Sequence, residues 1–190
     1  PTRSRERGVD VKIVAFCGYS GAGKTTLVEQ LVAHMVREGL RVSVVKHAHH
    51  DFDIDRPGKD SWRHRQAGAY EVVIGSDRRM AKMREYPRLE PPTPEALLGE
   101  LADCDWALIE GFKHAALPKI EVWRVANGKS ALEPDDRHVI AIATDDVASL
   151  PAPTSLPLFG LDEIERIVAF LRERGDRHEY RPDAGGAGAR

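Results

Sequence analysis

The feature that most constrains this sequence is a glycine-rich segment near its amino terminus, Gly18-Tyr19-Ser20-Gly21-Ala22-Gly23-Lys24-Thr25. An apolar run, 11–17, leads directly into it, and a segment with leucine, valine and methionine at helical spacing, 25–38, follows it. Glycines at these positions let the backbone turn tightly and point successive N–H groups at phosphate oxygens, and the start of the helix adds the positive end of its dipole. The pattern predicts a strand, a phosphate-binding loop (P-loop) and a helix.

The expected chemistry depends on a lysine, a hydroxyl and a carboxylate. Lys24 is expected to reach the β- and γ-phosphates and to serve catalysis, and the Thr25 hydroxyl to coordinate Mg²⁺. Such a loop needs a carboxylate opposite it, and the apolar strand expected at 106–109 lies between Asp105 and Glu110. We favour Glu110 as the second catalytic and metal-site residue, because phosphates bind at the carboxyl end of parallel strands. The alternative is a plain charge that ends the strand.

The length of 190 residues suits one well-buried core. We expect an α/β fold of the P-loop NTPase type, a three-layer sandwich with a mostly parallel sheet, as a single domain over residues 1–174. A flexible C-terminal tail is expected over 175–190. The patterns also predict strands at 41–46, 119–125 and 139–143, and helices at 60–69, 95–102 and 162–174.

Residues of about 70–86 are expected to form an added β-hairpin arm, with strands at 70–76 and 79–84. A lone two-stranded ribbon is marginally stable, and this one is rich in apolar side chains. We therefore expect a homodimer formed through the arm, in which charged substitutions at Val72 and Ile74 give monomers. The alternative is that the hairpin completes the chain's own sheet.

The overall charge excludes some classes of partner. A formal net charge of −2 gives no field for gathering nucleic acid or anionic membrane, so neither is expected as a partner. No apolar run is long enough to span a bilayer, and we expect a cytoplasmic protein. Cys17 and Cys104 each lie in or beside an apolar run, which favours buried thiols over a disulfide.

The choice of base is expected to depend on Thr144-Asp145-Asp146, which follows the strand expected at 139–143. A carboxylate there, Asp145 or its neighbour, can accept hydrogen bonds from N1 and the exocyclic amine of guanine. This resembles the base-reading aspartate of GTP-binding proteins without its usual Asn-Lys. A solvated turn is the alternative.

A second polar segment follows the strand expected at 41–46, and it concentrates histidine and aspartate: His47, His49, His50, Asp51, Asp53 and Asp55. These side chains suit a zinc or nickel site, or they orient magnesium waters, phosphate or substrate without a second metal. Lys59 and Ser61 then stand at an expected helix start. They suit another phosphate, or an ordinary capped helix.

Taken together, these motifs resemble the MobB family, the molybdopterin-guanine dinucleotide biosynthesis adapter proteins. The resemblance covers roughly 11–174 and includes the glycine loop to Thr26, the histidine and aspartate segment, Gly58-Lys59-Asp60-Ser61, Glu110-Gly111-Phe112-Lys113 and Lys119-Ile120. It implies a homodimeric protein that binds GTP, hydrolyses it slowly and assists MobA, the guanylyltransferase that joins GMP to molybdopterin. It implies that 18–26 hold the phosphates, that Gly111, Phe112 and Lys113 line the nucleotide site, and that His49, His50, Asp53, Lys59 and Ser61 face molybdopterin or its phosphate.

Two other functions use the same loop. A small-molecule kinase needs a lid with arginines, for which Arg78, Arg79 and Arg84 are candidates in strand-like sequence. A metallochaperone GTPase is supported by the histidines and weakened by the lack of a cysteine cluster.

Overall fold

The computed structural model describes residues 11–48, 52–87, 90–131, 136–175 and 178–180. The chain divides into two compact units, which are described separately. Unit 1 comprises 1–47 and 94–190, and unit 2 comprises 48–93. In the described part of the chain, no helix is both long and apolar enough to cross a membrane.

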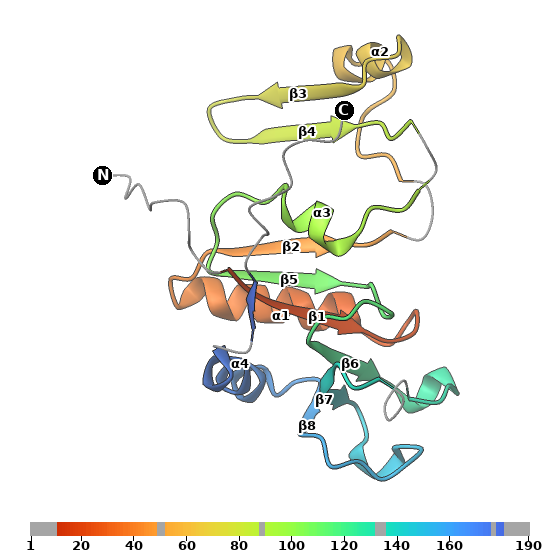
Figure 1. Cartoon of the computed structure of the whole chain (residues 1–190), viewed down its shortest axis with the longest axis vertical. Coiled ribbons are helices and arrows are strands. Elements are labelled where there is room, and N and C mark those ends of the chain that lie inside the picture. Colours follow the sequence, from red (N-terminus) through yellow and green to blue (C-terminus); the bar gives the residue numbers. More distant parts are fainter. Residues whose placement is uncertain (1–10, 49–51, 88–89, 132–135, 176–177, 181–190) are drawn as a thin grey trace. The chain divides into compact units, whose positions relative to one another are not determined.

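Unit 1 is built on a seven-stranded sheet (Figure 1). Its strands are β1 (Val11–Cys17), β2 (Val42–Lys46), β5 (Trp106–Glu110), β6 (Lys119–Trp123), β7 (Val139–Thr144), β8 (Leu158–Gly160) and β9 (Glu179–Tyr180). Six of them form the parallel order β2-β5-β1-β6-β7-β8, and β9 pairs with β1 in the antiparallel direction. The mostly parallel α/β fold is therefore confirmed. In the sheet, β5 lies between β1 and β2.

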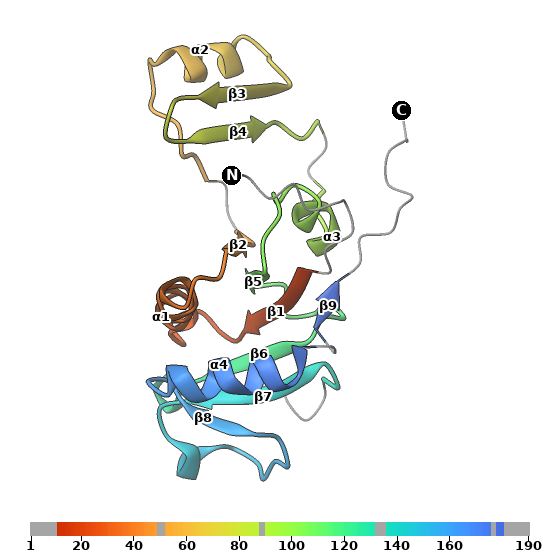
Figure 2. The ribbon, with the colours of Figure 1, turned by 90° about the vertical axis from the view of Figure 1, so that its left-hand side faces the viewer.

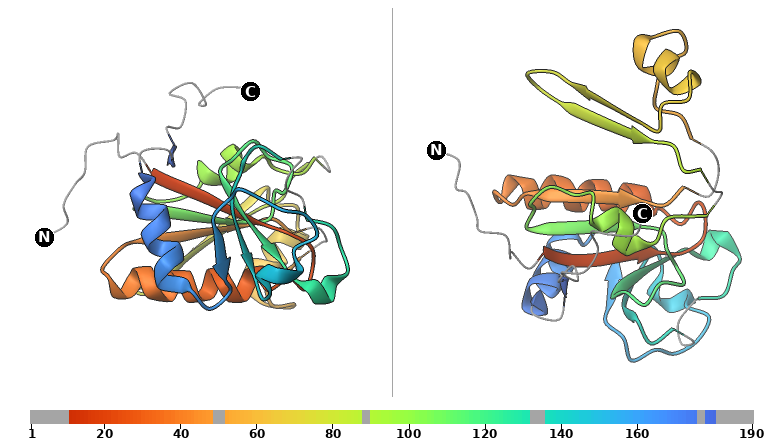
Figure 3. Two further views of the ribbon diagram at one scale, coloured as in Figure 1. Left: turned by 90° about the horizontal axis from the view of Figure 1, so that it is seen from below. Right: turned by 45° about the horizontal axis from the view of Figure 1, so that its top comes forward.

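Helices cover the sheet unequally. Helices α1 (Lys24–Arg37) and α4 (Ile164–Glu173) contact each other on one face, while the short α3 (Pro94–Leu98) lies on the other (Figure 2 and Figure 3, left). Alternate residues of β1 supply both cores, since successive side chains of a strand point to opposite faces. Val14 and Phe16 pack under α1 and α4, whereas Ile13 and Ala15 pack towards α3 and the neighbouring loops. This accounts for the continuous apolar run that precedes the glycine loop.

Several elements differ from the sequence expectations. The three-residue β8 and the 3-10 turns η1 (Val125–Asn127) and η2 (Val147–Ser149) were not expected. Helix α3 ends at Leu98 rather than at 102, and α4 begins at Ile164 rather than at 162. Cys17 and Cys104 are buried free thiols, as predicted. Burial, reinforced by repulsion from Glu121, raises the pKa of the Cys17 thiol to about 12, so it stays neutral.

Residues 178–180 were expected to belong to a flexible C-terminal tail, but Glu179 and Tyr180 form the short strand β9. β6 pairs only with residues 15–17 of β1, and β9 occupies the remaining part of that edge, beside Val11 and Lys12. The Ile13 N–H donates to the His178 carbonyl at 2.8 Å. The His178 ring is buried, with its centroid 5.8 Å from that of Trp106. An unpaired strand edge is a strong template for a further strand, which explains why this segment is held.

Burial of His178 predicts a dependence of stability on pH. Desolvation lowers the pKa of His178 below its ordinary value near 6.5. Above that value both the folded and the unfolded chain hold a neutral imidazole. As the pH falls below it, the unfolded chain takes up a proton that the folded chain resists, so stability is lost, by at most about 1.4 kcal/mol per pH unit for this one group. We expect His178→Phe to show a shallower loss of unfolding free energy between pH 7 and 5 than the parent, measured by urea denaturation. An identical slope would contradict this, and His114→Phe, at an exposed histidine, is the control.

Unit 2 contains α2 (Asp60–Gln66) and a hairpin of β3 (Glu71–Gly75) and β4 (Met80–Arg84). The hairpin is confirmed, and it forms a separate two-stranded sheet, so it does not extend the sheet of unit 1. One of its faces carries Val72 and Met83, a directly opposed pair that is half-buried, together with Ile74, which is 43% exposed. The other face carries Val73 and Met80, which are 59% and 68% exposed.

Candidate functional site

The glycine loop lies between β1 and α1, at the carboxyl end of the central strand. Gly18, Gly21 and Gly23 have φ angles of 130°, 81° and 96°, a region that side chains with a Cβ rarely adopt. Gly18 also faces the backbone of β6, where an added Cβ would lie 2.2 Å from the Val122 carbonyl oxygen. Gly23 is the N-cap residue of α1, so the loop leads directly into the first turn of the helix, whose N–H groups have no partner within the helix. The geometry is that of an anion cradle.

Lys24 folds back over this loop. Its Nζ donates hydrogen bonds to the carbonyl oxygens of Gly18 at 3.0 Å and Tyr19 at 2.8 Å. Desolvation lowers the pKa of the Lys24 ammonium, while the nearby Glu110 carboxylate acts in the opposite direction. A partly desolvated ammonium of this kind gains from an anionic partner.

Glu110 is the carboxylate that faces the loop. The Thr25 hydroxyl donates to Glu110 Oε1 at 2.8 Å, and Lys46 Nζ lies 3.4 Å from the same oxygen. Parallel register explains this meeting, because Phe16 of β1, Glu110 of β5 and Lys46 of β2 lie side by side. Asp105, the alternative, is at the other end of β5, where it accepts a hydrogen bond from the Arg41 N–H at 2.7 Å.

The turn after β5 brings Gly111, Phe112 and Lys113 to the same edge. Gly111 has a φ of 110°, and a Cβ there would lie 2.9 Å from the His47 Cβ. Phe112 has a positive φ of 51°, which is uncommon for a bulky residue, and its ring stacks on His47 with centroids 4.4 Å apart. Lys113 Nζ lies 5.5 Å from the centre of the Tyr19 ring in the glycine loop. These predicted site residues are therefore brought together with the loop.

A buried lysine supports this turn. Lys119 is fully buried, and its Nζ donates to the Lys113 carbonyl oxygen at 2.8 Å and to Asp136 Oδ2 at 2.7 Å. Burial acts to raise the pKa of Asp136, but the hydrogen bond from Lys119 holds it below its usual range. No role was predicted for Lys119 from the sequence, although a lysine inside an apolar strand is a signal for one.

The two neighbouring aspartates after β7 have different surroundings. Asp146 caps η2: its carboxylate accepts from the Ala148 N–H at 2.9 Å and from the Ser149 hydroxyl at 2.5 Å. The Ser149 hydrogen bond, followed by that from Ala148, lowers the pKa of Asp146. Asp145 is half-exposed, and its Oδ2 lies 3.9 Å from Arg124 Nε. Asp145 therefore retains acceptor capacity that Asp146 has already used.

The remaining predicted site residues belong to unit 2 or lie outside the described residues. His49 and His50, with Asp51, are outside them. Asp53 and Asp55 both accept from Arg65 Nη1, at 2.9 and 3.3 Å, and the Ser61 hydroxyl donates to Asp55 at 2.8 Å. Lys59 is exposed at the start of α2. Arg65, which also pairs with Glu85, organises this segment and was not selected from the sequence.

The donor set fits magnesium better than a transition metal. Thr25 and Glu110 offer a hydroxyl and a carboxylate, the oxygen ligands that Mg²⁺ takes, usually together with water and phosphate. Among the residues that the structure describes, no group of three or more His, Cys, Asp or Glu side chains is placed to hold a metal ion.

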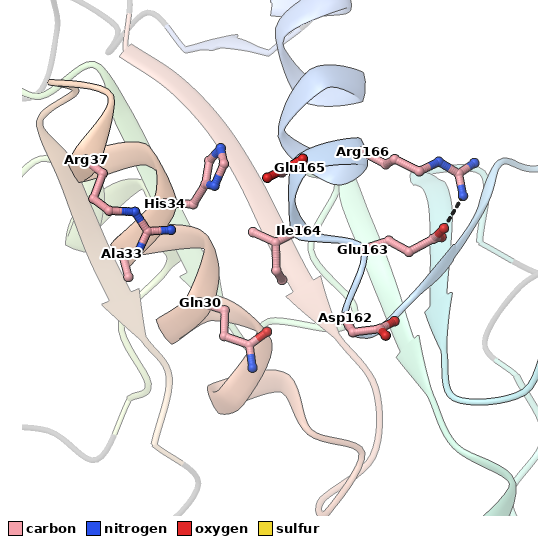
Figure 4. A pocket seen from close by; sticks show the side chains of 9 residues that line it. All are labelled: Gln30, Ala33, His34, Arg37, Asp162, Glu163, Ile164, Glu165 and Arg166. Atoms are coloured by element: carbon pink, nitrogen blue, oxygen red, sulfur yellow. Dashed lines mark hydrogen bonds and ion pairs between the residues drawn. The ribbon is translucent and has the colours of Figure 1, made fainter.

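A hollow of about 420 Å³ between α1 and the start of α4 is not part of this site (Figure 4). It is lined by Gln30, Ala33, His34, Arg37, Asp162, Glu163, Ile164, Glu165 and Arg166. Glu163 pairs with Arg166, and His34 lies 3.5 Å from Glu38. The described residues of the glycine loop are not among those lining it.

The sheet order, the glycine loop between β1 and α1, and the carboxylate opposite that loop define a class: an α/β protein with the P-loop NTPase fold. Residues 13–145 also match the family model described as "MobB: Molybdopterin guanine dinucleotide synthesis protein B". The chain therefore belongs to the MobB family.

Individual relatives agree with this assignment. The chain is 37% identical over 166 residues to the molybdopterin-guanine dinucleotide biosynthesis adapter protein of Escherichia coli, covering 86% of this chain and 93% of that protein. It is 37% identical over 164 residues to the protein of the same name from Haemophilus influenzae, covering 85% and 88%. Among solved structures, Bacillus subtilis MobB is similar with a TM-score of 0.65 and 26% identity, over 85% of this chain and 97% of that one.

Proposed function

We propose that this chain is an adapter protein of molybdopterin-guanine dinucleotide biosynthesis, which binds GTP with Mg²⁺, hydrolyses it slowly and assists the guanylyltransferase MobA. Membership of the MobB family and the names of the relatives support the adapter role in molybdopterin-guanine dinucleotide biosynthesis. The nucleotide chemistry rests on the site itself.

The meeting of Lys24, Thr25 and Glu110 carries the proposal. Lys24 and Thr25 are consecutive residues, whereas Glu110 comes from a distant part of the sequence. Because β1 and β5 are neighbours in the sheet, Thr25 Oγ1 lies 2.8 Å from the Glu110 carboxylate. Thr25 and Glu110 would hold Mg²⁺ directly or through water, and the ion would neutralise charge on the β- and γ-phosphates. The loop N–H groups and Lys24 would bind the same phosphates.

Calorimetric titration with non-hydrolysable GTP and ATP analogues, each with and without Mg²⁺, tests nucleotide binding. We expect magnesium-dependent binding with a preference for the GTP analogue. Phosphate release in the presence of GTP tests the slow hydrolysis. The assistance of MobA is tested by the rate at which MobA forms the guanine dinucleotide from molybdopterin with and without this chain. No change in that rate would rule out the adapter role under those conditions.

Asp145 is proposed as the residue that reads guanine, because Asp146 is already used in capping η2. We expect Asp145→Ala to lower the ratio of GTP to ATP affinity by about tenfold, as loss of hydrogen bonds between a charged group and the base would do. Asp146→Ala is the matched control, and it should leave the ratio unchanged while reducing stability slightly. If the two variants discriminate as the parent does, guanine is read elsewhere.

Unit 2 is proposed to bind molybdopterin through the segment that holds Asp53, Lys59 and Ser61. The exposed Lys59 ammonium supports recognition of a phosphate. The kinase alternative gains no support from unit 2, because Arg79 and Arg84 belong to a hairpin rather than to a helical lid, and Arg84 pairs with Glu71 at 2.7 Å.

We propose a homodimer formed through the β3–β4 hairpin. Val73 and Met80 share its exposed face, and a two-stranded ribbon with exposed apolar side chains favours pairing with another chain. Val72 is half-buried within unit 2, so it is a poorer probe of the interface than the sequence suggested.

The double variant Val73→Asp, Met80→Asp is expected to be monomeric at micromolar concentration and to bind GTP as the parent does. Charge on the exposed face opposes association without entering a core. Sedimentation velocity gives the oligomeric state, with Val147→Asp, at an exposed valine of unit 1, as the control. A monomeric parent would contradict the proposal.

A further inference from the structure

The start of the connection between β6 and β7, residues 124–127, lies beside the glycine loop. It begins with Arg124 and continues through η1 to Asn127, whose N–H donates to the Arg124 carbonyl oxygen at 3.1 Å. A Cβ built on Gly21 would lie 3.6 Å from Asn127 Oδ1. The connection therefore supports the loop from the side of β6.

Arg124 makes the closest approach. A Cβ built on Gly23 would lie 3.2, 3.4 and 3.5 Å from its Nη2, Nε and Cζ. The two nitrogens are slightly nearer than the central carbon, so the side of the guanidinium that carries Nε and Nη2 lies against Gly23. Gly23 is the N-cap of α1 and directly precedes Lys24, so the guanidinium is packed on the part of the loop that delivers the phosphate-binding groups.

The same guanidinium faces Asp145. Its Nε is shielded from solvent, makes no hydrogen bond to the described residues, and lies 3.9 Å from Asp145 Oδ2. Among the described residues this is the ion pair of Asp145, which otherwise has a half-exposed side chain on a turn. Arg124 is thus in contact with the phosphate loop on one side and with the proposed base-reading carboxylate on the other.

We propose that Arg124 is a positioning residue that links guanine recognition at Asp145 to the glycine loop. This inference rests on the proposed function, and it gives Arg124, the residue that directly follows β6, a role in base specificity beside that of Asp145. The planar guanidinium keeps Asp145 oriented towards the base, while its contact with Gly23 keeps the loop in register with that carboxylate. A lysine carries the charge but not the plane, so it would fulfil the role only in part.

A double-mutant cycle tests the link. The variants are Arg124→Ala, Asp145→Ala, the double variant, and Arg124→Lys, with Arg166→Ala as a control that removes an arginine elsewhere in unit 1. Each is titrated by calorimetry with GTP and ATP analogues and with inorganic triphosphate, and its thermal unfolding is recorded. We expect Arg124→Ala to lower the ratio of GTP to ATP affinity by about tenfold, Arg124→Lys to restore part of it, and the double variant to lose little more than either single variant.

The possible outcomes are distinct. Equal loss of affinity for GTP, ATP and triphosphate in Arg124→Ala would mean a general role in stability and would overturn the link, as would an unchanged ratio. Fully additive effects in the double variant would also overturn it. If the parent prefers GTP and Arg124→Ala prefers it to the same degree, only this inference fails. A parent that binds neither nucleotide overturns the proposed function, and this inference fails with it.

Discussion

Lys24→Ala is expected to weaken binding of the GTP analogue by at least about 30-fold, which corresponds to ~2 kcal/mol. The substitution removes a charged donor that faces the proposed phosphate site, and Lys24 is a half-buried residue at the start of α1 rather than part of the core. The fold should therefore persist, because the two hydrogen bonds that are lost go to carbonyl oxygens of the loop itself. Calorimetry gives the affinity, and circular dichroism gives the fold.

Lys129→Ala is the matched control, because it removes an exposed lysine from the same unit. It should bind as the parent does. Equal affinity in Lys24→Ala and the parent would exclude Lys24 from phosphate binding. A variant that unfolds instead would show that the contacts of Lys24 with Gly18 and Tyr19 are needed for the fold.

Gly18→Ala is expected to lower the free energy of unfolding by about 4 kcal/mol or more, a loss that few single substitutions cause. Two penalties combine at this position. The φ of 130° is unfavourable for any residue with a Cβ, and the added methyl would lie 2.2 Å from the Val122 carbonyl oxygen. That oxygen is backbone in β6, so relief requires β1 and β6 to separate. Urea denaturation measures the loss.

Gly39→Ala separates the two penalties. Gly39 also has a positive φ, 84°, but an added Cβ would meet nothing within 4 Å. Only backbone strain remains there, at a cost of about 1–2 kcal/mol. Similar losses in the two variants would show that the close approach of β1 to β6 contributes nothing beyond strain.

Much of the candidate site could be predicted from the sequence, because its causes are local or follow from strand direction. The glycines of 18–23 reveal a tight turn by their identity alone. The choice of Glu110 over Asp105 required only the rule that parallel strands present their carboxyl ends at one edge, and the structure places Glu110 beside Thr25. The burial of both cysteines followed from the apolar runs around them.

The features that were missed depend on contacts between distant parts of the sequence. Arg124 is an ordinary charged residue after a strand until β6 is placed beside β1 and its guanidinium meets Gly23. Arg65 gains its place from Asp53, Asp55 and Glu85 together, none of which is within one helical turn of it. β8 has three residues, too few for any periodicity to show. Asp145 rather than Asp146 keeps its carboxylate free to accept hydrogen bonds from a base, because Asp146 caps η2. The sequence does not predict that short turn.

The position of β9 sets a lower limit on how far this chain can be shortened. The part that matches the family model ends at 145, and the closing helix ends at Glu173, so Gly175 looks like a natural place to stop. A chain ended there would lose the imidazole packed on Trp106 and would leave the first residues of β1 as an uncovered edge. Uncovered edges recruit strands from other molecules, so a shortened protein would be prone to aggregate although its candidate site, at the opposite end of β1, is intact. Affinity tags and fusions on this chain therefore belong beyond Tyr180.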